Sequence, residues 1–179
     1  MVVAPRLPRV SVDPEDETEL VRAAQRGDTL AMNALLDRLA PYVGRICAPI
    51  AFASGPDAVQ ETLIAVFRNL RSLKEPQALR GWVRSIAVRE AVRAAARDMR
   101  AVPMDTALAD RPDGGDDQLA VDVRDQLARL SPEHRAVLVL RELEGLTEEQ
   151  AARLLEVPKG TVKSRLNRAR DSFRKAWSQ

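Results

Sequence analysis

Apolar residues recur every three or four positions along most of the chain, which is the period of an amphipathic α-helix. In the first half this pattern predicts helices at about residues 17–26, 29–39, 41–51, 57–70 and 77–100. In the second half it predicts helices at about residues 119–129, 132–143, 148–155 and 159–175. Alternating and β-branched runs are few, and we therefore predict an all-α fold.

Two segments break the helical pattern. Residues 1–16 are rich in proline and charge, so we expect a disordered N-terminal tail. Residues 101–117, AVPMDTALADRPDGGDD, contain two prolines, a Gly-Gly pair and several aspartates, which predicts a flexible acidic linker. The linker separates two small helical domains, an N-terminal one at residues 17–100 and a C-terminal one at residues 118–179.

Charged residues are distributed unevenly along the chain. The chain of 179 residues has 30% charged and 3% aromatic residues and a net charge of only +2. Residues 101–122 hold six acidic side chains and one basic one, so two basic bodies flank an acidic connector. The single cysteine, Cys47, lies in an apolar run and is expected in the core. We find neither a signal peptide nor a membrane span in the sequence, and a cytoplasmic protein is expected.

Residues 145–170, GLTEEQAARLLEVPKGTVKSRLNRAR, have the pattern of a helix-turn-helix motif. Thr147 is a favourable N-cap, and Gln150 three residues later completes a capping box. The second helix has an apolar face and a basic face, with seven basic residues and one acid between Lys159 and Lys175. A merely solvated helix would mix its charges more evenly, so the pattern favours binding in the DNA major groove.

Four stretches together resemble the extracytoplasmic-function (ECF) sigma factors, the two-domain promoter-recognition subunits of bacterial RNA polymerase. The C-terminal stretches are LSPEHRAVLVLRELEGLT, residues 130–147, and VPKGTVKSRLNRAR, residues 157–170. The N-terminal stretches are DAVQET, residues 57–62, and LRGWVRSIAVREAV, residues 79–92. The resemblance covers about residues 17–177.

The resemblance implies three functional surfaces. The C-terminal domain would read the −35 promoter element. Its main groove contacts would come from Lys163, Ser164, Asn167 and Arg168. Its contacts to the DNA backbone would come from Lys159, Thr161 and Arg165. The N-terminal domain would hold the −10 element through Arg71, Lys74, Arg80, Arg84, Arg89, Arg93 and Arg97. Core RNA polymerase would bind Asp57, Gln60 and Glu61, although helix capping alone also accounts for Asp57. Trp82 could stack on DNA, but its apolar register favours core packing.

Two residues depart from the family pattern. Arg89 stands where an asparagine usually helps to read the −10 strand, so we expect base preference there to be altered or exchanged for phosphate affinity. Glu156 stands where the turn usually has glycine, which costs about 1 kcal/mol if φ is positive. Neither change removes the scaffold.

The residues do not form a catalytic constellation, so we expect a protein that is not an enzyme and that has no cofactor and no metal site. His134 is expected to be a surface or capping residue. The main function predicted is an ECF-type sigma factor with promoter DNA, core polymerase and an anti-sigma factor as partners. Two alternatives stay open, namely an autonomous helix-turn-helix regulator and a sigma-like protein that titrates a partner.

Overall fold

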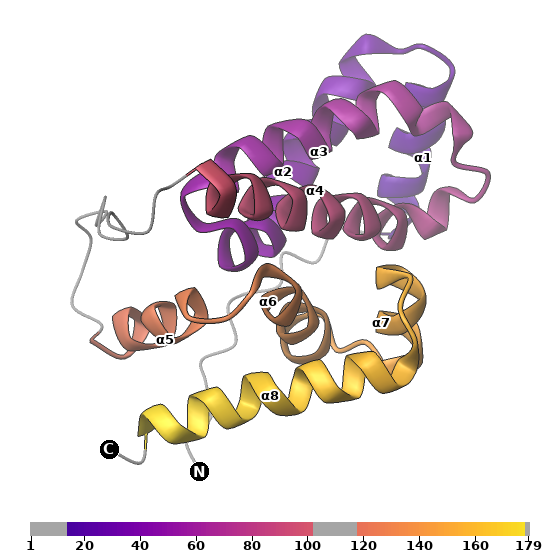
Figure 1. The fold of residues 1–179 in the computed structure, drawn as a ribbon. Coiled ribbons are helices and arrows are strands. Elements are labelled where there is room, and N and C mark those ends of the chain that lie inside the picture. The colour runs from indigo at the N-terminus through magenta and orange to yellow at the C-terminus, as the bar shows by residue number, and fades with distance from the viewer. Residues whose placement is uncertain (1–13, 102–117, 178–179) are drawn as a thin grey trace.

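The computed structural model describes residues 14–101 and 118–177, and every regular element within these ranges is helical (Figure 1). The N-terminal half contains α1 (Pro14–Gln25), α2 (Thr29–Ala51), α3 (Gly55–Asn69) and α4 (Leu79–Ala101). The C-terminal half contains α5 (Gln118–Ala128), α6 (Pro132–Leu138), α7 (Glu148–Leu155) and α8 (Lys159–Trp177). The predicted all-α class is therefore confirmed. Most of the expected tail and linker, residues 1–13 and 102–117, lies outside the described residues.

Helix α2 is a single helix where the sequence predicted two. Asp28 caps its start, because one carboxylate oxygen accepts hydrogen bonds from the backbone N–H groups of Leu30 and Ala31 at 2.9 and 3.0 Å. Pro41, expected to end one helix and begin another, lies inside α2. An interior proline costs about 3 kcal/mol. Here a long buried face outweighs that cost, and it comprises Leu35, Leu39, Val43, Ile46, Cys47 and Ile50.

Three other boundaries differ from the prediction. Helix α1 begins at Pro14, two to three residues early, since proline suits the first position of a helix. The segment 71–76, expected to be a loop, is partly helical, because it contains parts of the 3-10 turns η2 (Leu70–Ser72) and η3 (Pro76–Ala78). The Gln25 side chain donates to the carbonyl oxygens of Leu70 and Leu73 at 2.9 and 2.7 Å, which ties this segment to α1. Helix α3 begins at Gly55 rather than near residue 57, and Ser54 does not cap it, because its hydroxyl instead donates to the Asp98 carboxylate of α4.

The second predicted helix of the C-terminal half changes its geometry midway. Ser131 caps α6, which ends at Leu138 rather than near residue 143. A π-helical turn, η4 (Val139–Leu143), follows, and the N–H of Glu144 donates to the Val139 carbonyl at 3.0 Å. Gly145 then adopts a φ of +67°, as expected of a residue that ends a helix.

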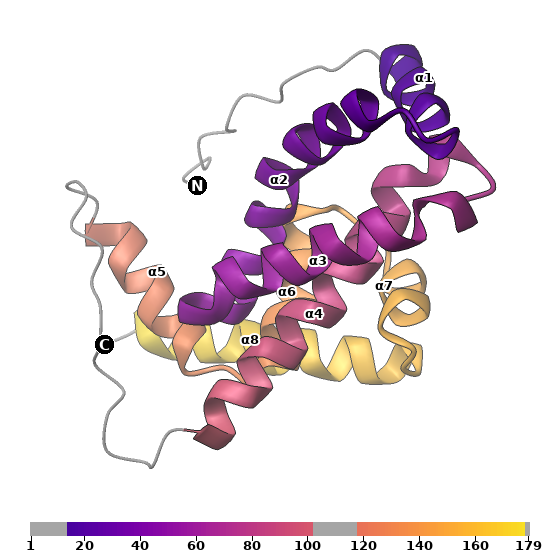
Figure 2. The ribbon, with the colours of Figure 1, turned by 90° about the horizontal axis from the view of Figure 1, so that it is seen from above.

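The two halves pack against each other through α4. On one side α4 contacts α2 and α3, and on the other side it contacts α6 and α7 (Figures 1 and 2). A third contact joins α2 to α6. One continuous apolar core results, with Val83, Ala87 and Val88 of α4 and Val137 and Leu140 of the C-terminal half all fully buried.

Candidate nucleic-acid interface

The start of the helix-turn-helix has the predicted capping box. The Gln150 N–H donates to the Thr147 hydroxyl at 3.2 Å, and the Thr147 N–H donates to the Gln150 side-chain oxygen at 2.8 Å. Two otherwise unpaired N–H groups are thereby satisfied, which defines the first residue of α7. The start of α7 is thus fixed by hydrogen bonds between two residues that are three positions apart.

The turn between α7 and α8 is a Schellman motif with glutamate in place of glycine. Glu156 has φ 55° and ψ 40°, the left-handed conformation. Its N–H donates to the Arg153 carbonyl at 3.4 Å, and the N–H of Val157 donates to the Ala152 carbonyl at 3.1 Å. The φ of Glu156 is therefore positive, so the cost of about 1 kcal/mol expected for that case applies.

Helix α8 has a buried face and a basic exposed face. Val162, Leu166 and Ala169 are at most 3% exposed, in the register expected from the sequence. We call the opposite side the recognition face, and its exposed residues are Lys163, Ser164, Asn167 and Arg168. Of the residues expected to hold the DNA backbone, Lys159 is exposed, whereas Thr161 and Arg165 are half-buried. The structure therefore presents long cationic and amide side chains along one line of the helix, which suits a DNA groove.

Contacts at and beside α8 shift the pKa values of Lys159, Glu149 and His134. The Glu149 carboxylate bonds Lys159, which raises the pKa of the lysine and lowers that of the glutamate. His134 lies at the start of α6, where its Nδ1 bonds the Ser131 hydroxyl at 2.7 Å. Burial first, and then the positive charges of Arg165 and Arg168, lower the pKa of His134. The lowered pKa favours the neutral imidazole beside the recognition face.

The arginines of α4 occupy two environments. Arg89, Arg93 and Arg97 are exposed and spaced by four residues, so they lie along one side of the helix. Arg93 forms an ion pair with Glu90 of the same helix at 2.7 Å. Arg84 is instead half-buried. Arg71 and Lys74, which precede α4, are exposed, and Trp82 packs against the core as expected.

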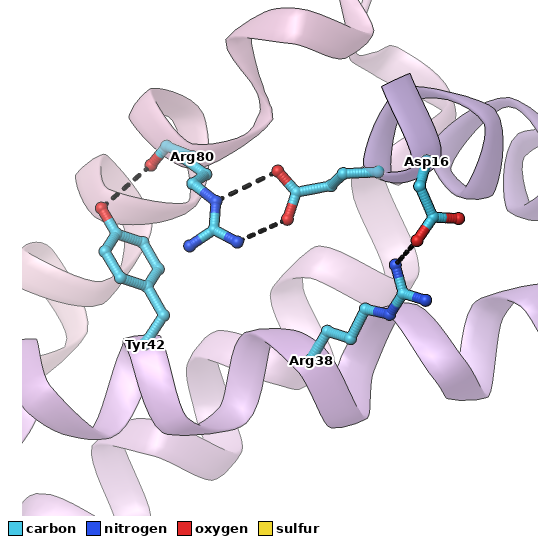
Figure 3. Close-up of polar contacts among 5 residues, drawn as sticks. Asp16, Arg38, Tyr42 and Arg80 are labelled. Carbon is cyan, nitrogen blue, oxygen red and sulfur yellow. Dashed lines mark hydrogen bonds and ion pairs between the residues drawn. The ribbon is translucent and has the colours of Figure 1, made fainter. Parts of the chain in front are cut away.

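Arg80 serves the fold of the N-terminal half. Its guanidinium forms a two-point ion pair with the Glu17 carboxylate of α1, at 2.7 and 3.1 Å. It also lies over the Tyr42 ring, 5.3 Å from the ring centre. Figure 3 shows this arrangement beside a second ion pair between α1 and α2, in which Arg38 bonds Asp16 at 2.7 Å. The hydrogen bond to Glu17 raises the pKa of Arg80, which remains a fixed cation joining α1, α2 and α4.

Helix α3 carries the residues expected to bind polymerase. Asp57, Gln60 and Glu61 are exposed in its first two turns. Phe67 on the same helix is 59% exposed, seven residues beyond Gln60 and therefore on the same side. Aromatic side chains are enriched at protein-binding surfaces, so the exposed ring of Phe67 fits such a surface.

Sequence reasoning missed the contact between the two halves. We call this contact the seam; its residues are Tyr42, Phe52, Arg84 and Arg89 from the N-terminal half, and Arg135, Glu144 and Glu156 from the C-terminal half. Glu144 accepts from the Tyr42 hydroxyl at 2.9 Å and from Arg84 at 3.1 Å. Glu156 lies 3.5 Å from Arg89. The partners of Glu144 are 102 and 60 residues away in the chain, so no local pattern points to them.

The described residues contain no group of three or more His, Cys, Asp or Glu side chains that could hold a metal ion. Among the helices in the described part of the chain, none is long and apolar enough to cross a membrane. Cys47 is fully buried, as predicted.

The all-α fold and its capped basic helix define a helix-turn-helix protein, and comparisons with known proteins specify the family. The model of the family described as Sigma-70, region 4, matches residues 120–172. The ECF RNA polymerase sigma-E factor of Haemophilus influenzae is 31% identical over 170 residues, which span 85% of this chain and 90% of the relative. The ECF RNA polymerase sigma factor SigE of Mycolicibacterium smegmatis is 32% identical over 179 residues, which span 91% of this chain and 69% of the relative. The chain therefore belongs to the ECF RNA polymerase sigma factors.

Solved structures agree on the fold. CnrH, in complex with the cytosolic domain of CnrY, matches with a TM-score of 0.62 at 22% identity, covering 90% of this chain and 97% of that one. The sigma factor RpoE of Bartonella quintana, in complex with the anti-sigma factor NepR, matches with a TM-score of 0.61 at 24% identity. The match covers 82% of this chain and 96% of that one. At these identities the likeness concerns the arrangement of helices.

Proposed function

We propose that this sigma factor directs core RNA polymerase to promoters by dividing the work between its two halves. The recognition face of α8 binds the −35 element, and the exposed arginines of α4 hold the −10 strand as it opens. Asp57, Gln60 and Glu61 of α3 dock on the polymerase. The observation that carries this proposal is the recognition face itself, which stands on a capped and locally defined helix-turn-helix.

Residues 17–100 and 118–179 then act as two functional domains, and residues 101–117 connect them. The protein acts without catalysis of its own and in the cytoplasm, where the polymerase is. Since the two solved neighbours were obtained as complexes, one of them with an anti-sigma factor, we also propose that this chain is held by a protein of that kind.

Reconstituted transcription tests the proposal. The chain is mixed with core RNA polymerase and a pool of genomic promoter fragments, and run-off products and permanganate footprints are recorded. We expect transcripts and reactive thymines near the start site only when the chain and the polymerase are both present. Duplex binding without polymerase would indicate an autonomous regulator, and polymerase binding without opening would indicate a protein that titrates its partner.

Two variants separate the proposed roles of the halves. Arg168→Ala removes one base-edge contact, worth about 1–3 kcal/mol, so holoenzyme affinity for duplex promoter should fall by roughly 5- to 150-fold. Arg89→Ala should leave that affinity nearly unchanged and reduce permanganate reactivity. Arg153→Ala is the control, because it removes an equal charge from an exposed position on α7. Equal loss of duplex affinity in the first two variants, without a specific loss of opening, would contradict the division of work.

A further inference from the structure

Helix α1 holds the segment that joins α3 to α4, although the two are far apart in the sequence. We call residues 70–78, which contain the turns η2 and η3, the α3–α4 segment. The side-chain amide of Gln25 donates to the carbonyl oxygens of Leu70 and Leu73, which lie 45 and 48 residues further along the chain. The N–H of Leu73 also donates to the Leu70 carbonyl, at 3.1 Å. Gln25 therefore bridges the two ends of one backbone turn.

The turn that follows α1 also meets the first exposed cation of the segment. Gly27 has a φ of +99°, a left-handed value that suits glycine. A Cβ at Gly27 would stand 3.7 Å from Nη2 of Arg71, so the guanidinium lies beside bare backbone. The end of α1 thus contacts the main chain of the segment through Gln25, and the glycine after it contacts the Arg71 side chain.

The same helix holds the far end of the segment. Arg80, two residues beyond it, forms the two-point ion pair with Glu17 of α1. The Glu17 side chain is only 13% exposed, and salt screens such a pair less than one on the open surface. Glu17 and Gln25 are eight residues apart, so they lie on the same side of α1, about 12 Å apart along its axis. Helix α1 therefore contacts the chain at both ends of the α3–α4 segment.

Between these two attachments the segment directs its cations outward. Leu70 and Leu73 are buried, whereas Arg71 and Lys74 are exposed. Apolar packing of the leucines is not directional, but hydrogen bonds to their two carbonyl groups fix the orientation of the peptide planes. Arg71 stands between the two bonded residues and Lys74 follows the second, so these peptide planes set the direction in which both cations leave the surface.

We propose that Gln25 is a positioning residue for promoter opening, because its two hydrogen bonds fix the α3–α4 segment and thereby place Arg71 and Lys74 for the −10 strand. The inference rests on the proposed function for the identity of the −10 surface. Both amide hydrogens of Gln25 are engaged inside the protein, so this residue acts through the two cations. A cation that is placed before binding loses less conformational freedom when it meets a phosphate.

Limited proteolysis of the free full-length chain tests whether Gln25 holds the segment. Gln25→Met keeps the length of the side chain and removes both donated hydrogens. Cleavage by trypsin after Arg71 and Lys74 requires local opening, so it should be roughly fivefold faster or more in this variant. Cleavage after Arg153, exposed on α7, should be unchanged. Gln126→Met is the matched control, because it makes the same chemical change at a half-buried position of α5.

Two outcomes of the proteolysis would overturn the inference. Equal cleavage of the segment in Gln25→Met and the parent chain would show that the two hydrogen bonds do not hold it. Equally faster cleavage at every site would show that the substitution loosens the whole chain. This measurement needs no promoter and no polymerase.

Promoter opening by the holoenzyme supplies the second readout. The DNA is the strongest promoter fragment found in the reconstituted transcription, and circular dichroism confirms that each variant is folded. Gln25→Met should lower permanganate reactivity roughly two- to tenfold and leave affinity for the closed duplex, measured in the cold, nearly unchanged. General destabilisation would instead lower both quantities together. Unchanged opening, or equal loss of opening and duplex affinity, would overturn the inference.

A double-mutant cycle tests whether Gln25 acts through the cations. When Arg71 and Lys74 are both replaced by alanine, Gln25→Met should cause little further loss of opening, because the groups that it positions are gone. A full additional loss would overturn the inference.

Run-off transcription by the parent chain separates the two proposals. Transcription by the parent together with equal opening by Gln25→Met would defeat only the positioning role. Absence of transcripts from the parent chain and polymerase would defeat the proposed function, and the role of Gln25 in opening with it.

Discussion

The left-handed Glu156 gives a quantitative prediction for the stability of the helix-turn-helix. An L-residue in this conformation costs about 1–2 kcal/mol, and glycine avoids that cost because it has no Cβ. Glycine also gives the unfolded chain more freedom, which offsets about 0.4–1 kcal/mol. Glu156→Gly should therefore be more stable than Glu156→Ala by about 0.5–1 kcal/mol. The alanine variant is the right reference, because both changes remove the carboxylate that lies 3.5 Å from Arg89.

Urea and thermal unfolding of the full-length chain, followed by circular dichroism at 222 nm, measure this difference. For a protein of this size it corresponds to a melting temperature higher by about 1–4 °C in the glycine variant. The Schellman hydrogen bonds of the turn are formed by the backbone, so both variants can retain them. If Glu156→Gly unfolds at the same temperature as Glu156→Ala or below it, the backbone of this turn is not strained and the reasoning is refuted.

Two further predictions concern a helix cap and a buried thiol. Thr147→Ala removes the hydroxyl that accepts from the Gln150 N–H, so the free energy of unfolding should fall by about 1 kcal/mol in urea, and Thr147→Ser should restore most of it. Burial raises the pKa of the Cys47 thiol from 9.0 to about 12, so the folded chain retains a proton that the unfolded chain releases above pH 9. The resulting stability is complete below pH 9 and is lost as the pH rises toward 12, by about 1.4 kcal/mol at pH 10. Cys47→Ala should show a smaller decrease in urea midpoint between pH 8 and pH 10, and an equal decrease in both proteins would contradict this assignment.

Local chemistry explains what the sequence could predict. The capping box of Thr147 and Gln150 and the buried register of α8 depend on residues a few positions apart, and both were predicted correctly. A short motif also identified Glu156 as the turn residue that is strained if its φ is positive, but it did not predict the sign of φ. The assignments of DNA-binding and polymerase-binding residues stay predictions, although the structure leaves many of them exposed.

Features that depend on packing could not be predicted in the same way. Pro41 has a strong local preference against a helix interior, but the buried face of α2 overrides it. The π-helical turn before Glu144 has no local signal of its own. The seam joins Tyr42 to Glu144 across 102 residues, and amphipathic patterns identify the buried side of a helix without identifying the helix that covers it.

The burial of Cys47 makes the chain convenient for kinetic work. Its thiol is fully buried and its Sγ lies 3.7 Å from the Ala87 carbonyl oxygen, so a labelling reagent can reach it only when the packing around α2 opens. The rate of labelling therefore measures how often the N-terminal half opens. Fluorophores can meanwhile be attached to cysteines introduced at exposed positions, with the native residue left in place. The labelling rate of Cys47 thus reports the opening of the N-terminal half, while probes at exposed positions report on the seam.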